Sequence, residues 1–201
     1  MKLVCLDLEG VLVPEIWIAL AESTGIGELQ RTTRDEPDYE KLMAFRLRVL
    51  EKNNLTLFDI QKVIAGISPL PGAAEFLSEL RTKTQVIILS DTFEQFAMPL
   101  MQKLNFPTLF CNTLECTQDG VIRGWRARQK NGKKEAVRAF KSCNFSVFAA
   151  GDSFNDIAMI EEAGCGCLFR ASSAVRAAYP LLTTIGFYDD LQKAIANFLG
   201  A

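Results

Sequence analysis

Carboxylates follow two apolar runs of this chain, at the points where each run ends. Asp7 and Glu9 come directly after the run at residues 3–6, and the acidic segment 152–156 follows a second run. A carboxylate beside a buried strand end can act as a nucleophile or metal ligand, and a second acid nearby can carry protons. If both runs are strands of one parallel sheet, their carboxyl ends meet in one crevice, where open α/β sheets bind ligands.

Two further polar segments also lie at the ends of expected elements. Ser90, Asp91 and Thr92 follow an apolar run, and Lys133 opens a helical pattern after an Asn-Gly pair. Each has a structural alternative: the first could cap a helix, Lys133 and Lys134 could lie on a solvated face, and the acidic segment could cap a helix and complement its dipole. Their joint occurrence at element ends favours a functional site.

The elements that must position these residues alternate along the chain. Apolar, strand-like runs occur at residues 3–6, 86–89, 147–150 and 165–169, with a weaker one at 181–185, and helical spacing occurs at 73–80, 93–104, 133–140 and 156–163. Such alternation predicts an α/β fold with a doubly wound parallel sheet. A turn signal at residues 118–120 predicts a β-hairpin over 115–128.

A long segment without a good strand separates the first strand from the second. Within it, residues 16–21, 39–50 and 57–64 have helical spacing. A single crossover does not need so much chain. We therefore expect a small helical cap at residues 14–70, inserted into a catalytic core formed by residues 1–13 and 71–201.

Composition excludes several classes of protein. The 201 residues contain no histidine, which excludes every mechanism that needs an imidazole base or ligand. The net charge of −2 predicts no nucleic-acid partner, and no apolar run approaches the ~20 residues of a membrane span. The N-terminal residues lack a signal-peptide pattern. Six cysteines without zinc-like spacing are expected to be reduced core thiols of a cytoplasmic protein.

Phosphoryl transfer is the chemistry that suits these residue types. A carboxylate such as Asp7 can attack phosphorus and form an aspartyl phosphate, while Glu9 protonates the leaving oxygen and later activates water. Ser90 and Lys133 can bind phosphoryl oxygens. Mg²⁺ would offset the clustered charge; its expected ligands are Asp7, Asp152, Asp156 and Glu9, the last through a backbone carbonyl.

The order of these motifs resembles the haloacid-dehalogenase superfamily of phosphatases. Its four motifs correspond to Asp7-Leu8-Glu9, Ser90-Asp91-Thr92, Lys133 and the segment 151–156, and the resemblance covers nearly the whole chain. A helical cap after the first motif is similar to that of phosphoserine phosphatases. The resemblance implies a Mg²⁺-dependent enzyme whose substrate is also contacted by Ser90, Asp91, Thr92 and Asn155.

The cap narrows the substrate that this resemblance implies. Tyr39 and Arg46 have about the spacing of the phosphoserine-binding aromatic and arginine, so Arg46 would bind the substrate carboxylate and Glu15 would face its amino group. Arg48 is the alternative to Arg46. Glu9 stands where most relatives have Asp. In this feature the chain resembles a bacterial branch of phosphoserine phosphatases that also transfers the phosphoryl group from phosphoserine to homoserine.

Three alternatives differ in class. A phosphatase of this superfamily could act on another small phosphomonoester. A phospho-receiver also uses an aspartyl phosphate, Mg²⁺, a hydroxyl and a lysine, but it carries its phosphorylated Asp on a middle strand and has no cap. Dehalogenation needs no metal and would leave Asp152 and Asp156 without a compensating cation.

Overall fold

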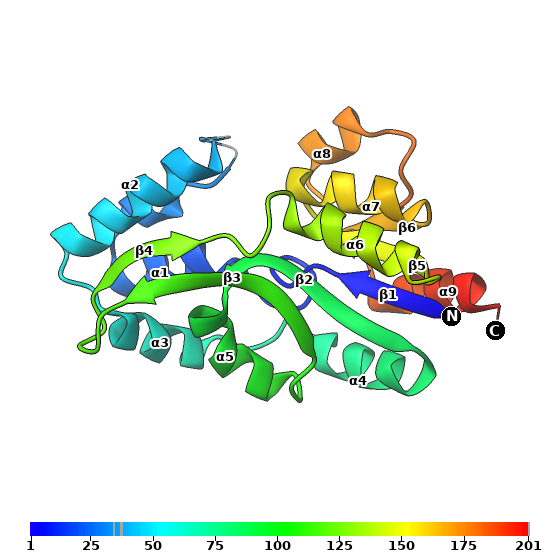
Figure 1. Ribbon diagram of the computed structural model, residues 1–201, viewed down its shortest axis with the longest axis horizontal. Helices are drawn as coiled ribbons and strands as arrows, with labels where there is room; N and C mark the ends of the chain where they lie inside the picture. Colours follow the sequence, from blue (N-terminus) through cyan, green and yellow to red (C-terminus); the bar gives the residue numbers. More distant parts are fainter. Residues whose placement is uncertain (34, 37, 201) are drawn as a thin grey trace.

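The fold is a seven-stranded sheet in which β1 is the central strand. The computed structural model describes residues 1–33, 35–36 and 38–200. Its sheet has the order β4-β3-β2-β1-β5-β6-β7, with β4 antiparallel and the other strands parallel (Figure 1). This confirms the predicted doubly wound α/β fold. The strands are β1 Lys2–Leu6, β2 Gln85–Phe93, β3 Thr108–Cys116, β4 Ile122–Arg126, β5 Ser146–Gly151, β6 Gly166–Phe169 and β7 Thr184–Ile185.

Helices cover both faces of the sheet. Alternate residues of β1 point to these two opposite faces, so each residue packs against the helices on its own side. Val4 and Leu6 pack in the core that contains α4, α5 and α9, whereas Leu3 and Cys5 pack against α6, α7 and α8. The strand is therefore apolar throughout, as expected for a strand buried on both faces. These helices are α4 Ala73–Lys83, α5 Glu94–Lys103, α6 Gly132–Ser142, α7 Ile157–Ala163, α8 Ser173–Ala178 and α9 Tyr188–Leu199.

The segment between β1 and α4 is helical, and it lies beyond the carboxyl end of β1 (Figure 1). It contains α1 Ile16–Thr24, the 3-10 helix η1 Gly27–Gln30, α2 Tyr39–Lys52 and α3 Leu57–Gly66. Asp38 caps α2, and Thr56 and Asp59 form a capping box on α3. The α3 helix packs on α5, and α2 packs near β4, so this segment rests on the core through two separate elements.

The structure differs from the sequence prediction beside β2. The predicted hairpin exists, but its first strand begins at Thr108 and also pairs in parallel with β2. The run was missed because polar Thr108, Asn112 and Thr113 interrupt it. The second strand continues through Phe93, with irregular pairing after Leu89, so the Ser-Asp-Thr segment lies within the strand and does not follow it.

The expectation that the cysteines are core thiols is only partly right. Cys5 and Cys167 are buried, Cys111 is half-buried, and the other three are exposed. None of the six forms a disulfide in the part of the chain that the structure describes. The exposed cysteines lie at or next to strand and helix ends, where a local apolar pattern does not report burial.

Candidate active site

Asp7 lies directly after β1, and the residue is only 4% exposed. The backbone N–H of Asp7 donates to the Ala150 carbonyl at 2.9 Å, which continues the pairing with β5. One carboxylate oxygen, Oδ1, accepts from the N–H of Leu8 at 2.7 Å. The carboxylate is therefore fixed at the carboxyl edge of the sheet, between the ends of β2 and β5.

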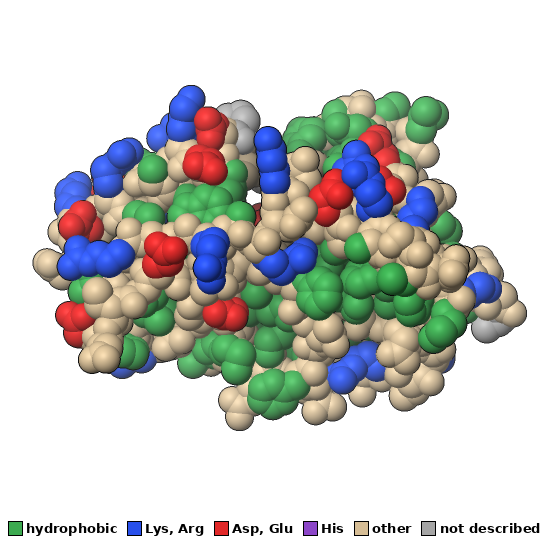
Figure 2. All heavy atoms as spheres, in the orientation of Figure 1, with side chains coloured by type: hydrophobic (Ala, Val, Ile, Leu, Met, Phe, Trp, Pro, Cys, Tyr) green, Lys and Arg blue, Asp and Glu red, His purple; other side chains and the backbone are tan. Residues whose placement is uncertain are grey.

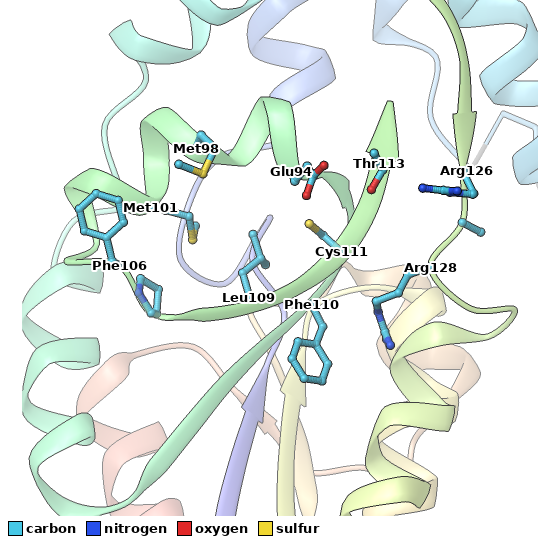
Figure 3. Close-up of a pocket in the computed structure, with 12 residues that line it drawn as sticks. Glu94, Met98, Met101, Phe106, Leu109, Phe110, Cys111, Thr113, Arg126 and Arg128 are labelled. Atoms are coloured by element: carbon cyan, nitrogen blue, oxygen red, sulfur yellow. The ribbon is translucent and has the colours of Figure 1, made fainter. Parts of the chain in front are cut away.

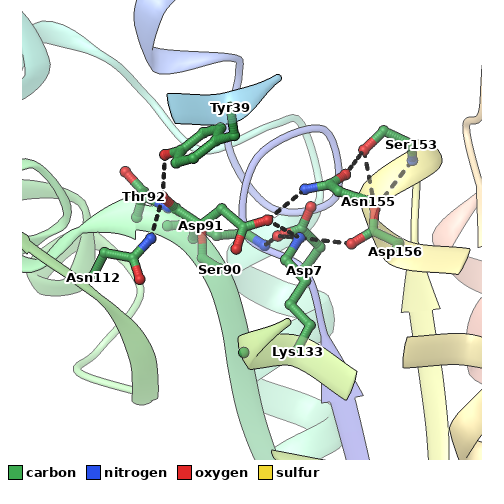
Figure 4. A network of polar contacts seen from close by, with 12 residues as sticks. Asp7, Tyr39, Ser90, Asp91, Thr92, Asn112, Lys133, Ser153, Asn155 and Asp156 are labelled. Atoms are coloured by element: carbon green, nitrogen blue, oxygen red, sulfur yellow. Dashed lines mark hydrogen bonds and ion pairs between the residues drawn. The ribbon is translucent and has the colours of Figure 1, made fainter. Parts of the chain in front are cut away.

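Lys133 brings a positive charge to this carboxylate. Its Nζ lies 2.9 Å from Asp7 Oδ1 and 2.6 Å from Asp156 Oδ1, and all three side chains are buried (Figure 4). Lys133 stands in the first turn of α6. A lysine buried between two carboxylates is not the solvated helix face of the structural alternative, and its neighbours hold its pKa well above the usual range.

The acidic segment after β5 is organised by Asp156. Its Oδ2 accepts from the N–H of Asp152 at 3.0 Å and of Ser153 at 3.1 Å, and the Ser153 hydroxyl also donates to it. Capping is thus real for Asp156, as the structural alternative predicted, but Oδ1 of the same carboxylate holds Lys133. The residue serves both the turn and the charged cluster.

Two glycines provide the space for these carboxylates. A Cβ at Gly10, whose φ is +75°, would lie 2.4 Å from Asp152 Cγ, and one at Gly151 would lie 2.2 Å from Asp156 Cγ. No side chain fits at either position without displacing an acid. Glycine is therefore required at both positions for the same steric reason, since the carboxylates of Asp152 and Asp156 occupy the space where a Cβ would lie.

Three carboxylates meet at one point. Single oxygens of Asp7, Asp152 and Asp156 all lie within 4.8 Å of one another. Burial and the neighbouring acids raise the pKa of Asp7 well above its usual range, although Lys133 opposes this, and burial together with Asp156 raises the pKa of Asp152 to about 7. One lysine does not offset this charge, and hard oxygen ligands in this arrangement suit a divalent cation such as Mg²⁺.

Asp91 connects several parts of the site. Its carboxylate accepts from Asn155 Nδ2 at 2.8 Å and lies 3.8 Å from Lys133 Nζ, while its backbone carbonyl accepts from Tyr39 Oη and Asn112 Nδ2, each at 2.9 Å (Figure 4). The residue thus links α2, β3 and the acidic segment.

Ser90 and Thr92, on either side of Asp91, do not cap a helix. Both are buried; Ser90 Oγ accepts from the N–H of Thr92 at 3.2 Å, and the α5 N-terminus has no side-chain cap. Ser90 and Thr92 instead line the cavity in which the charged residues meet. The capping alternative is therefore wrong for this segment.

Glu9 stands apart from the three clustered carboxylates. Its Oε2 accepts from the N–H of Ile16 at 2.8 Å, at the beginning of α1. Burial raises the pKa of Glu9 to about 7, and Glu15 adds to this rise. A carboxyl group with this pKa can both give and take a proton near neutral pH.

Arg46 and Tyr39 reach the same cavity from α2. The Arg46 guanidinium is buried and lies 4.4 Å from the centre of the Trp17 ring, and Nη2 donates to the Arg31 carbonyl at 2.9 Å. Arg48, two positions further along α2, is exposed and does not line the cavity. The geometry therefore favours Arg46 over Arg48 as the arginine of the site.

The cavity enclosed by these groups measures about 90 Å³. All of the predicted site residues line it except Asp156, which lies beneath Lys133 and Asp152. The sequence did not point to Trp17, which resembles a core residue in an apolar run, or to Asn112, which lies in the part of β3 that precedes the predicted hairpin. The lining comprises Asp7, Glu9, Glu15, Trp17, Thr32, Thr33, Tyr39, Arg46, Ser90, Asp91, Thr92, Lys133, Asp152, Ser153 and Asn155.

A larger groove lies elsewhere, between α5, β3 and the loop after β4. It measures about 620 Å³, and its lining is mainly apolar and includes the exposed Met98 and Phe106 (Figure 3). On the face of the molecule shown in Figure 2, hydrophobic side chains gather in patches between charged ones. Its charged residues are Glu94, Arg126 and Arg128, which form no buried cluster. Reactive groups converge in the smaller cavity and not in this groove.

A doubly wound sheet with a buried Asp, a Lys and an acidic cluster at its carboxyl edge is typical of hydrolases that use a carboxylate nucleophile. The sequence pattern of the haloacid dehalogenase-like hydrolases matches residues 1–164. The chain belongs to this family, as its motifs predicted.

Relatives with similar sequences and structures agree with this assignment. The chain is 52% identical over 193 residues to phosphoserine phosphatase ThrH of Pseudomonas aeruginosa, covering 96% of this chain and 94% of that one. It is 50% identical over 192 residues to a phosphoserine phosphatase of Pseudomonas syringae pv. tomato, covering 96% and 81%. A solved phosphoserine phosphatase in apo form has a TM-score of 0.72 at 25% identity, with 92% of each chain covered.

Proposed function

We propose that this protein is a Mg²⁺-dependent phosphoserine phosphatase that works through a phosphorylated Asp7. The observation that carries the proposal is the position of Asp7, buried between Lys133 and two further carboxylates at the floor of a cavity. Arg46 and Glu15 line the same cavity, and their charges complement the two charged ends of an amino acid. The names of the two Pseudomonas relatives support phosphoserine as the substrate.

Two displacements complete the proposed reaction. An oxygen of Asp7 attacks phosphorus, the bond from phosphorus to the serine oxygen breaks, and Glu9 gives that oxygen its proton. Water then attacks the aspartyl phosphate and gives a proton to Glu9, while the bond from phosphorus to Asp7 breaks. The pKa of Glu9, raised to about 7, suits both proton transfers.

The carboxylate cluster fits a magnesium ion. Asp7 and Asp152 would hold it, together with the backbone carbonyl of Glu9, and when bound it supplies positive charge against the phosphoryl oxygens. Asp156 already accepts from Lys133 at one oxygen and from backbone N–H groups at the other. We therefore infer that it mainly orients Asp152 and Lys133 and adds charge to the site.

Recognition of the substrate would come from both sides of the cavity. Ser90, Asn155 and Lys133 would bind phosphoryl oxygens, because each brings a donor to the cavity beside Asp7. Arg46 would bind the substrate carboxylate, and Glu15 would bind its ammonium group. Tyr39, whose hydroxyl donates to the Asp91 carbonyl, would form the wall between these two regions, with Asp91 and Thr92 beside it.

Transfer to homoserine is a second activity that Glu9 favours. Its side chain is one methylene longer than Asp, and the N–H of Ile16 holds one of its oxygens. We propose that this places water poorly and lets an alcohol acceptor such as homoserine compete for the aspartyl phosphate. The cytoplasmic location predicted from the cysteines stays a prediction. Among the helices of the described residues, none combines the length and the apolar character of a membrane span.

Phosphate release is the direct test. Purified protein would be given phosphoserine and a panel of other phosphomonoesters, with Mg²⁺ or with EDTA, and free phosphate and phosphohomoserine would be measured. Asp7→Asn should abolish turnover, whereas the control Asp189→Asn, at an exposed acid of α9, should leave it unchanged. Full activity of Asp7→Asn would overturn the mechanism, and preference for another phosphomonoester would overturn the substrate.

A further inference from the structure

The guanidinium of Arg46 is held on several sides. Its flat face lies on the Trp17 ring, with 4.4 Å between the guanidinium carbon and the ring centre. At its edge, Nη2 donates to the Arg31 carbonyl at 2.9 Å, and Nη1 lies 3.9 Å from the sulfur of Met43. A planar group fixed at one face and one edge has little freedom to rotate.

One atom of this group has no partner. Arg46 Nε is buried and makes no hydrogen bond with any of the described residues. A buried donor without an acceptor is costly, so such atoms usually point to a ligand or to water. Nε and Nη2 lie on the same side of a guanidinium, and a carboxylate can accept from both at once. The Arg31 carbonyl uses one of the two Nη2 hydrogens and leaves the other for this purpose.

Trp17 is itself fixed by the core. It lies at the beginning of α1, is 6% exposed, and makes an edge-to-face contact with Phe96 of α5 at 5.5 Å between ring centres. Phe96 has no exposed surface and contacts Phe93 in the same way. The ring that supports Arg46 is therefore connected, through Phe96 and Phe93, to β2, the strand that carries Ser90.

We propose that Trp17 is a positioning residue that sets the plane of Arg46, so that its Nε edge meets the substrate carboxylate. Trp17 thereby makes the enzyme prefer phosphorylated amino acids to phosphomonoesters without a carboxylate. This inference rests on the proposed phosphoserine phosphatase function. Nothing in the apolar run around Trp17 distinguishes this role from ordinary core packing.

The test compares phosphoserine with phosphoethanolamine, which lacks only the carboxylate, and with inorganic phosphate, which lacks the whole amino-acid part. Phosphoserine would be the substrate, and phosphoethanolamine and inorganic phosphate would be competitive inhibitors without a carboxylate. Trp17→Leu should raise KM for phosphoserine roughly tenfold and change kcat less than about twofold, which is the size expected for loss of a partly desolvated cation–π contact. Both inhibition constants should stay within about twofold.

A conservative variant and a double variant make the test independent of folding. Trp17→Phe keeps a ring beside the guanidinium, so its KM should lie between those of the parent and Trp17→Leu, and its melting temperature should fall no further than that of Trp17→Leu. In an Arg46→Ala background, Trp17→Leu should raise KM by less than about twofold more, because the group that it positions is gone.

Two results would overturn this role. Equal weakening of phosphoserine and of both carboxylate-free probes would show general damage to the fold or cavity. An additive effect in the Arg46→Ala background would show that Trp17 acts without Arg46. Absence of phosphoserine hydrolysis in the unchanged protein would instead overturn the proposed function, so the two failures are distinguishable.

Discussion

The ammonium group of Lys133 lies 2.9 Å from the carboxylate of Asp7, in a place where both side chains are buried. Asp7 follows the central strand, and Lys133 begins a helix that packs on one face of the sheet. Their ion pair therefore connects the expected nucleophile, at the end of β1, to the helical layer that contains α6. Lys133 is also paired with Asp156, whose Oδ1 lies 2.6 Å from Nζ.

Removing Lys133 should damage both stability and turnover. Lys133→Met leaves Asp7 and Asp156 buried without their cation, so the free energy of unfolding should fall by about 3–5 kcal/mol in metal-free buffer. Phosphate release should fall more than about 100-fold. Urea denaturation and a phosphate assay measure these effects, and Lys134→Met, at the next position of the same helix, is the matched control. A Lys133→Met protein as stable as its parent would contradict the assigned role.

Gly10→Ala should disturb the metal site from a position that has no functional group. The new Cβ would lie 2.4 Å from Asp152 Cγ at a φ of +75°, so the carboxylate must move. We expect the Mg²⁺ concentration for half-maximal activity to rise roughly tenfold, which corresponds to about 1.4 kcal/mol. Gly27→Ala, where a Cβ meets nothing within 4 Å, should have no such effect. Identical Mg²⁺ titrations for both variants would count against this packing.

Arg46 and Arg48 should differ strongly in their effect on phosphoserine binding. Arg46→Ala should raise KM roughly 100-fold, because truncating one partner of a buried charge pair costs a few kcal/mol. Arg48 is exposed, so Arg48→Ala should change KM less than about twofold. Steady-state kinetics on phosphoserine measure both. The opposite ranking would make Arg48 the carboxylate-binding residue.

The stability of the metal-free protein should fall as the pH rises from 6 to 8. Folding raises the pKa of Glu9 and of Asp152 from their ordinary values of about 4 to about 7, so between these pH values the folded state holds more protons than the unfolded state. Loss of these protons therefore weakens the folded state. Thermal melting in EDTA should show the higher Tm at pH 6.

Magnesium should reverse this trend. A divalent cation offsets the same negative charge, so it should raise Tm more at pH 8 than at pH 6. In Asp152→Asn, both the fall of Tm with pH and the effect of Mg²⁺ should be reduced. A metal-free Tm that rises with pH would refute the assigned pKa shifts.

Glu9→Asp should shift the fate of the phosphoryl group. A shorter acid is expected to place water better, so the ratio of free phosphate to phosphohomoserine should rise several-fold in the presence of homoserine. Phosphorus NMR of the reaction mixture gives this ratio directly. The unchanged protein, assayed at the same Mg²⁺ and homoserine concentrations, is the reference. An unchanged ratio would show that the length of residue 9 does not select the acceptor.

Much of the site was predictable because its residues stand at fixed places relative to local patterns. Asp7 follows the central buried strand, Lys133 opens a helix, and Asp156 closes a turn that begins with a glycine. Parallel strands bring such ends to one edge, so their meeting follows from the fold class alone. Residues 14–70 were expected to be helical for a similar local reason, since three periodic runs lie in that segment.

Other features depend on tertiary contacts that no local pattern contains. Whether Arg46 or Arg48 enters the cavity depends on how α2 is rotated against α1 and β4, and Trp17 becomes a support for Arg46 only through that packing. The third parallel strand, with Asn112, was hidden by its polar residues.

The fold class and the chemical types at the sheet edge could be predicted from the chain alone, because strand and helix periodicity and the residues at element ends are local properties. Tertiary packing sets the raised pKa values of Glu9 and Asp152, the sharing of Lys133 by Asp7 and Asp156, and the orientation of Arg46. Burial and the distances between charges, which set these properties, arise only when distant segments pack together.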